Sequence, residues 1–206
     1  MSNLRLMKIA VLFFVILTFA LGCNFEIGNS QIDKYQPTPE FQAKIYNEVD
    51  SINSSVELQA YLRQIYALDQ KYRAEENDVL DKFGHDSKEY KQIWEKINQT
   101  DAENLVRVEY IFKKFGYPKR SEVGEIAASA PWFVVHHVSG DNAVREKHFK
   151  IIYRAYVDGN ISGGQMDFYL GRMYRIKFGT YFNMPSQFKE HEKIDTLIQI
   201  LELKKK

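Results

Sequence analysis

Apolar residues recur at intervals of three and four along most of the chain, and this spacing constrains the fold more than any other feature. After Ser54 they fall at Leu58, Leu62, Ile65 and Tyr72, on one face of an α-helix. The alternation of a half-buried β-strand is nowhere sustained, and only 134–135 and 178–182 allow a short one. The sequence predicts an all-α fold, a single bundle-like domain of about six or seven helices.

Capping residues and glycines give the expected helix boundaries. The helices are expected to begin at capping or helix-starting residues, namely Thr38, Ser54, Asp86, Ser121, Asp141, Ser162 and Pro185. Ser54 and Ser162 each have Glu or Gln three residues later, which is the capping-box pattern. The helix that follows Asp86 either breaks near 99–100 or continues to Phe115.

The first 22 residues have the zones of a secretory signal. Arg5 and Lys8 are followed by an apolar run over 9–21, and the segment ends at Gly22-Cys23. The last residues resemble the bacterial lipobox, although Leu is commoner at position 20 and a small residue at 21. This resemblance implies diacylglyceryl transfer to Cys23 and cleavage before it.

The chain is therefore expected to be a lipid-anchored lipoprotein of the bacterial cell envelope, attached to the membrane at Cys23. Its parts are a signal peptide over 1–22, a tether over 23–37 and a helical domain over 38–206. A plain secretory signal with a buried cysteine and an uncleaved membrane anchor are the alternatives.

A lone cysteine leaves no partner for a disulfide, so the domain must be stabilised by its core. Cleavage at residue 22 removes two basic residues and no acidic one. Lys+Arg falls from 28 to 26 against 27 Asp+Glu, a net charge of −1. A near-neutral chain is not suited to broad electrostatic binding of nucleic acid, and we expect no such partner.

Two polar residues interrupt apolar helix faces. Asp69 lies on the Leu58–Tyr72 face, four residues before Arg73, so the two can form an ion pair. This pair either orients the helix at the edge of the core or lines a pocket. Asn104 lies beside the apolar face over 105–115, which Asp101 extends by one turn. If the helix breaks near residue 100, Asp101 lies in a first turn and interacts favourably with the helix dipole.

The segment 122–138 is apolar on nearly all sides, which predicts a central, buried helix. His137 continues the line of Ile126, Ala130 and Phe133, and is either a satisfied core residue or a general base or ligand contact. His136 points about 100° away, so the two histidines cannot readily share one metal ion. We expect no metal site and no cofactor, because the chain has no phosphate-binding loop or metal-ligand spacing.

Arg172 shares a helix face with Gln165, Tyr169 and Ile176, and Gly171 leaves room beside it. Its side chain either packs its stem on the core with the charge in water, or clamps a carboxylate or phosphate.

Several motifs follow one another in an order that resembles an uncharacterised bacterial family, domain of unknown function 6624. They are Asp69-Gln70-Lys71-Tyr72-Arg73, Asp101-Ala102-Glu103-Asn104, Gly116-Tyr117-Pro118, Ser121-Glu122-Val123-Gly124 and His136-His137. The match covers roughly 58–182. His136 stands where the family has Gln, Gly171 where it has Asp before Arg172, and 178–181 replaces its Tyr-Gly-Thr-Gln segment. The resemblance supports the residue set and implies no reaction.

Two functions are compatible with these residues, and whether the protein is an enzyme is left open. The first is a binding or interaction module with a small-molecule or protein ligand. The second is an envelope hydrolase with His137 as base, Asp69 as its partner, and Arg73 or Arg172 holding an anionic group. The hydrolase hypothesis requires His137, Asp69, Asn104 and Arg172 around one open pocket.

Overall fold

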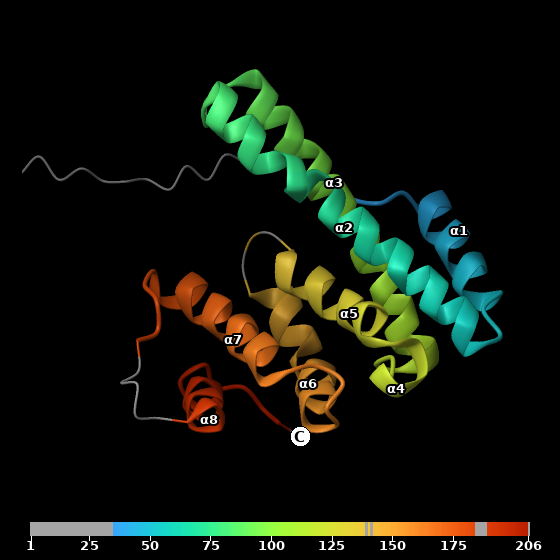
Figure 1. Cartoon of the computed structure of the whole chain (residues 1–206), viewed down its shortest axis with the longest axis vertical. Coiled ribbons are helices and arrows are strands. Elements are labelled where there is room, and N and C mark those ends of the chain that lie inside the picture. Colours follow the sequence, from blue (N-terminus) through green and yellow to red (C-terminus); the bar gives the residue numbers. More distant parts are fainter. Residues whose placement is uncertain (1–34, 139, 141, 184–188, 206) are drawn as a thin grey trace, which may run out of the picture. The chain divides into compact units, whose positions relative to one another are not determined.

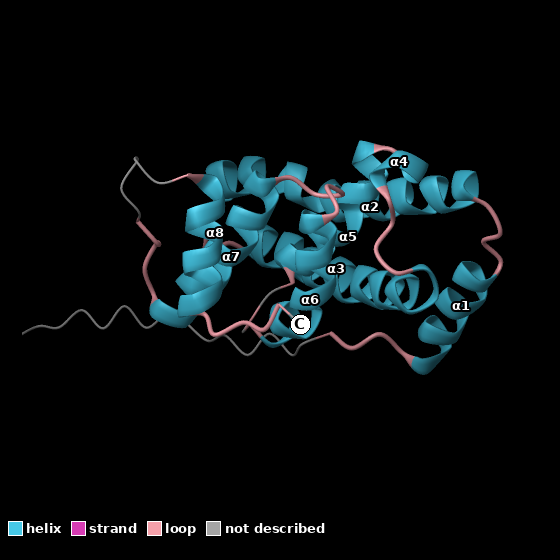
Figure 2. Cartoon of the chain, turned by 90° about the horizontal axis from the view of Figure 1, so that it is seen from below, coloured by secondary structure: helices cyan, strands magenta, loops and turns pink. Residues whose placement is uncertain are grey.

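The computed structural model describes residues 35–138, 140, 142–183 and 189–205. The expected signal peptide, Cys23 and most of the expected tether lie outside the described residues. The described part contains α-helices joined by loops, and the possible strands at 134–135 and 178–182 are not formed there (Figure 2). The predicted all-α fold is therefore confirmed. The described helices are α1 (Pro39–Asp50), α2 (Ser55–Phe83), α3 (Lys88–Phe115), α4 (Arg120–Val123), α5 (Glu125–His137), α6 (Ala143–Val157), α7 (Gly163–Phe178) and α8 (Glu190–Ile200).

Three of the expected N-caps are present, because each side-chain oxygen accepts a backbone N–H of the first helical turn. Thr38 caps α1 through the amide of Phe41. Ser54 and Ser162 form complete capping boxes at the starts of α2 and α7. Local sequence signals were sufficient at these three positions.

Other boundaries differ from the prediction. Ser87, not Asp86, caps α3 through the amide of Tyr90, since its hydroxyl has the required register. The α3 helix is continuous through 99–100, so Asp101 lies mid-helix and the expected first-turn interaction with the helix dipole does not apply. Asn142 stands at the N-cap of α6, but its side chain makes no capping hydrogen bond, and Asp141 lies outside the described residues. Pro185 also lies outside them, and α8 begins at Glu190.

The segment expected to form one helix after Ser121 is instead two helices, α4 and α5. The chain turns between them at Gly124, whose φ of +80° strongly favours glycine. A Cβ at this position would lie 3.3 Å from the Gln59 amide nitrogen, which itself donates to the carbonyl of Val123 at 2.7 Å. Contact with α2 therefore accompanies the break, and this contact is not visible in the local pattern.

The α2 and α3 helices form a long antiparallel hairpin whose tip extends beyond the other helices (Figure 1). The α5 helix packs against both arms, and Ala127, Ala128 and Ala130 are essentially unexposed where neighbouring helices approach. The predicted central, buried helix is thus α5, beginning at Glu125. The α1 helix packs on α3, α6 lies against α5 and α7, and α7 packs on α8.

Within the described ranges, no helix has the length and apolar character needed to cross a membrane.

Candidate functional site

Helices α2, α3 and α5 bring four of the polar residues in the sequence motifs into one cluster. Asp69 and Arg73 come from α2, Asp101 from α3 and His137 from the last turn of α5. The Asp69 side chain is fully buried. Its carboxylate accepts a hydrogen bond from the Gln70 amide at 2.6 Å, and its Oδ2 lies 2.9 Å from Nδ1 of His137. The cluster therefore satisfies a buried carboxylate whose burial would otherwise be costly.

Arg73 lies between two buried carboxylates. Its Nε is 3.8 Å from Oδ2 of Asp69, which is the ion pair expected from the sequence. Its Nη2 donates to Oδ1 of Asp101, and this second ion pair joins α2 to α3. The Oδ2 of Asp101 is buried without a hydrogen-bond partner. Burial accordingly raises the pKa of Asp101, and the nearby Arg73 guanidinium offsets only part of that effect.

His137 is held in a defined orientation by this carboxylate. Its Nδ1 contacts both oxygens of Asp69, at 2.9 and 3.2 Å, and its ring lies 5.6 Å from that of Phe133. If Nδ1 carries the proton, Nε2 is the acceptor nitrogen, and it makes no hydrogen bond to the described part of the chain. The side chain is 17% exposed. An Asp-oriented imidazole with a free Nε2 is an arrangement that can take up a proton.

Asn104 belongs to the core and not to this cluster. It is unexposed, and its side-chain Nδ2 donates a long hydrogen bond of 3.5 Å to the backbone carbonyl of Ile65 on α2. Its Oδ1 accepts a hydrogen bond from Arg107 at 3.1 Å. These contacts make Asn104 a brace between α2 and α3. Both polar ends of Asn104 have partners inside the hairpin, and its place in the hydrolase constellation stays a prediction.

Arg172 on α7 is a partly buried cation. It forms no ion pair or hydrogen bond with any described residue, and its Nε is buried without a partner. Burial lowers its pKa, the positive charges of Arg175 and Arg73 lower it further, and the negative charge of Asp101 offsets part of this effect. Its Nε–H is thus buried without the hydrogen bond that usually accompanies burial, and the choice between a solvated cation and an anion clamp stays a prediction.

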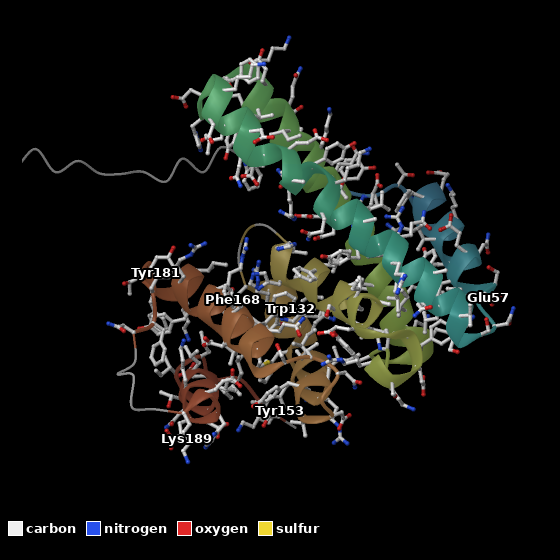
Figure 3. The ribbon with its side chains drawn as sticks, in the orientation of Figure 1. Glu57, Trp132, Tyr153, Phe168, Tyr181 and Lys189 are labelled. Carbon is white, nitrogen blue, oxygen red and sulfur yellow. The ribbon has the colours of Figure 1, made fainter. Side chains whose placement is uncertain are left out.

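Arg172 lines a pocket of about 410 Å³ on the α7–α8 side of the domain. Its lining residues are His136, Asp167, Phe168, Gly171, Arg172, Arg175, Tyr181, Phe182 and Lys193. Figure 3 shows Phe168 on α7 and Tyr181 just beyond the C-terminal end of that helix. His137, Asp69 and Asn104 are not among the lining residues, so this pocket does not unite the full set that the hydrolase hypothesis requires.

His136 connects this pocket to the α5 helix. It is 8% exposed and stacks on Trp132 with ring centroids 4.8 Å apart. Burial first, and then the charge of Arg172, lower the pKa of His136 to about 2. Its imidazole is therefore neutral at physiological pH, and its buried Nδ1 has no protein partner. The two histidines differ in role, because His136 lines the pocket whereas His137 contacts Asp69.

Sequence reasoning missed several residues that shape the site. Arg145 on α6 is unexposed and donates to the backbone carbonyls of His136 and Val138, which holds the end of α5. The signal was available, since Arg145 continues the apolar line of Phe149 and Ile152. Asp167 and Lys193 form a 2.7 Å ion pair from α7 to α8. No local pattern marks that pair, because the two residues are distant in sequence.

No group of three His, Cys, Asp or Glu side chains that could hold a metal ion occurs among the described residues. Comparison with protein-family models, with curated proteins and with solved structures finds no match to this chain.

Proposed function

We propose that this protein is a lipid-anchored binding module of the bacterial cell envelope that recognises an anionic group through Arg172. The observation that carries the proposal is the unpartnered Arg172 in the wall of a pocket. A guanidinium that is partly removed from water and forms no ion pair is unfavourable by itself, and the negative charge of Asp101 offsets only part of that cost. A carboxylate or phosphate would satisfy its hydrogen bonds and its charge together, with the planar geometry that arginine favours.

Calorimetric titration of the protein with inorganic phosphate and with acetate tests this proposal. Binding of at least one anion is expected, and Arg172→Met should weaken it about tenfold or more, because a hydrogen bond to a charged group contributes roughly 1.5–3 kcal/mol. Arg154→Met is the matched control, since Arg154 is exposed and pairs only with Asp158. Equal affinities for wild type and Arg172→Met would contradict the proposal.

The anchoring part of the proposal rests on the lipobox-like residues that end at Cys23. Two or more acyl chains, each contributing about 0.8 kcal/mol per buried CH₂, would hold the chain on a bilayer. Cells that express the wild type should incorporate radioactive palmitate into this protein, and cells that express Cys23→Ala should not. Equal labelling of both proteins would refute lipidation at Cys23.

The contact between His137 and Asp69 favours a second candidate function, an envelope hydrolase that uses these two residues without Asn104 and without the Arg172 pocket. In that reaction Nε2 of His137 takes a proton from water while the water oxygen attacks an ester or amide carbon. Asp69 stabilises the imidazolium, which then returns the proton to the leaving group. Hydrolysis of 4-nitrophenyl esters should fall with both His137→Gln and Asp69→Asn. Wild-type rates no faster than those of the two variants would exclude this candidate for such substrates.

We also propose membership of the family called domain of unknown function 6624. Three separate motif segments supply Asp69, Arg73, Asp101 and His137, and these residues meet in one cluster. A shared site explains why motifs far apart in the sequence would occur together. An aligned set of relatives should then keep the acidic, arginine and histidine positions together, and independent variation at these positions would contradict membership.

A further inference from the structure

The Arg172 pocket has more positive than negative side chains in its lining. Arg172, Arg175 and Lys193 are cations, and Asp167 is the carboxylate among the described lining residues. Lys193 is paired with Oδ2 of Asp167 at 2.7 Å. Two positive charges, on Arg172 and Arg175, are therefore left without an anionic partner in the wall.

These two cations are prepared for a ligand in different ways. Arg172 has no partner among the described residues. Arg175 donates to the hydroxyl of Tyr181 at 2.7 Å and lies 5.2 Å from the centre of its ring. Tyr181 thereby positions the guanidinium without neutralising it. Two adjacent, uncompensated guanidinium groups repel each other, and an anion that carries two charges relieves this repulsion better than a single carboxylate does.

Asp167 adds a polar contact of the opposite kind. Its Oδ2 accepts from Lys193, while its Oδ1 is buried and has no hydrogen-bond partner. This oxygen can accept an O–H from a ligand hydroxyl or from a protonated phosphate oxygen. A ligand with both acceptor and donor oxygens would satisfy Arg172 and Asp167 at once.

The pocket also has apolar walls and more room than a phosphate group needs. Phe168 is 70% exposed and Tyr181 is 73% exposed, which is unusual for large aromatic side chains next to a pocket. Phe182 forms another part of the wall and packs edge-on against Tyr174. A volume of about 410 Å³ lies within the range of small-molecule sites. Covering the exposed aromatic surface would contribute to binding through the hydrophobic effect.

We infer that the Arg172 pocket binds a phosphomonoester whose phosphate is attached to an apolar or aromatic group. The phosphate lies between Arg172 and Arg175, and the organic part lies against Phe168 and Tyr181. This inference rests on the proposed anion-binding function and names its ligand class.

The test compares three probes that separate charge from apolar contact. Phenyl phosphate carries both features, inorganic phosphate lacks the ring, and benzoate has the ring with one negative charge. Each is titrated calorimetrically into the full chain in detergent at a pH well above the second phosphate pKa of about 6. Phenyl phosphate is expected to bind about tenfold or more tightly than either of the others.

Variants assign the two parts of the ligand to the two parts of the pocket. Arg175→Met should weaken phenyl phosphate and phosphate but have a smaller effect on benzoate. Phe168→Ser should weaken phenyl phosphate and leave inorganic phosphate unchanged. Arg154→Met is the control for loss of a surface charge, and circular dichroism verifies that each variant is folded. Both Arg175 and Phe168 are exposed, so these substitutions should spare the core.

The outcomes separate the ligand class from the proposed function. If phenyl phosphate and inorganic phosphate bind equally, and both depend on Arg172, the ligand class is wrong while anion binding stands. If no probe binds, both are wrong. Competition with a short-chain phosphatidic acid shows whether the phosphomonoester is a lipid headgroup or a soluble molecule. If the phosphatidic acid displaces phenyl phosphate and the matching phosphatidylcholine does not, a lipid headgroup is supported. If only phenyl phosphate binds, a soluble phosphomonoester is supported.

Discussion

Replacing Arg73 with methionine is expected to destabilise the domain far more than the same change at a surface arginine. Arg73 is the cation between two buried carboxylates, with side-chain exposures of 18% for Arg73, 0% for Asp69 and 6% for Asp101. In the variant, Asp69 keeps its contacts with Gln70 and His137. Asp101 loses the hydrogen bond from Arg73 to its Oδ1, and its buried Oδ2 already has no partner among the described residues.

Removing one member of a buried ion pair typically costs about 3–5 kcal/mol. We expect a loss near 3 kcal/mol, at the lower end of that range, because Arg73 still reaches solvent. Arg154→Met removes an exposed pair with Asp158 and should change stability by less than about 1 kcal/mol. The double variant Arg73→Met with Asp101→Asn should recover much of the loss, since no unpaired charge then remains at position 101.

The loss of stability in Arg73→Met should also depend on pH, and it should be larger at high pH than at low pH. Burial raises the folded-state pKa of Asp101, so protonation of this group favours the folded state at low pH. Its stabilising contribution is complete below the ordinary aspartate pKa and is lost as the pH rises through the folded-state pKa. Arg73→Met raises that pKa further, so its deficit should be larger at about pH 8 than at about pH 5.

Urea unfolding followed by circular dichroism measures all of these differences. A deficit in Arg73→Met no greater than in Arg154→Met would refute the claim that Arg73 braces two buried carboxylates. A deficit that grows as the pH falls would refute the explanation based on Asp101.

The braces and caps give three further predictions, each measured by the same unfolding experiment. Asn104→Ala should lose roughly 1–3 kcal/mol, because it leaves buried polar groups of the hairpin unsatisfied, and no loss would mean that Asn104 is not a brace. Ser54→Ala should lose about 0.5–2 kcal/mol by removing the capping box with Glu57, and an unchanged midpoint would contradict that role. Tyr169→Phe should lose about 1–3 kcal/mol, since the backbone carbonyl of Arg145 would lose its buried donor, whereas wild-type stability would show that the bond contributes little.

The helical fold follows from signals that are local in the sequence. The periodic face from Leu58 to Tyr72 predicts α2, and the capping boxes at Ser54 and Ser162 give two helix starts within one residue. Errors arose where tertiary contacts decide the boundary. The turn at Gly124 accompanies its contact with Gln59 on α2, and this contact joins residues far apart along the chain.

Some residues of the candidate site were predictable from the sequence, but the contacts between them were not. The apolar faces marked Asp69, His137 and Arg172 as unusual, and the spacing correctly suggested the ion pair between Asp69 and Arg73. The ion pair between Arg73 and Asp101 depends on the register of the α2–α3 hairpin, which the sequence pattern does not specify. The pocket was missed for a similar reason, because its lining comes from separate helices that meet only in the folded domain.

The central claim is that Arg172, which forms no ion pair with the described residues, contacts an anionic ligand directly. Nuclear magnetic resonance of the Arg172 Nε–H, assigned by its absence in Arg172→Met, tests this claim during titration with phenyl phosphate. The structure predicts a saturable shift of this resonance, because Nε is buried beside the Nη groups, and an anion bound at those groups changes the electric field at Nε–H. An Nε–H resonance that stays in place while phenyl phosphate binds elsewhere on the protein would contradict the claim.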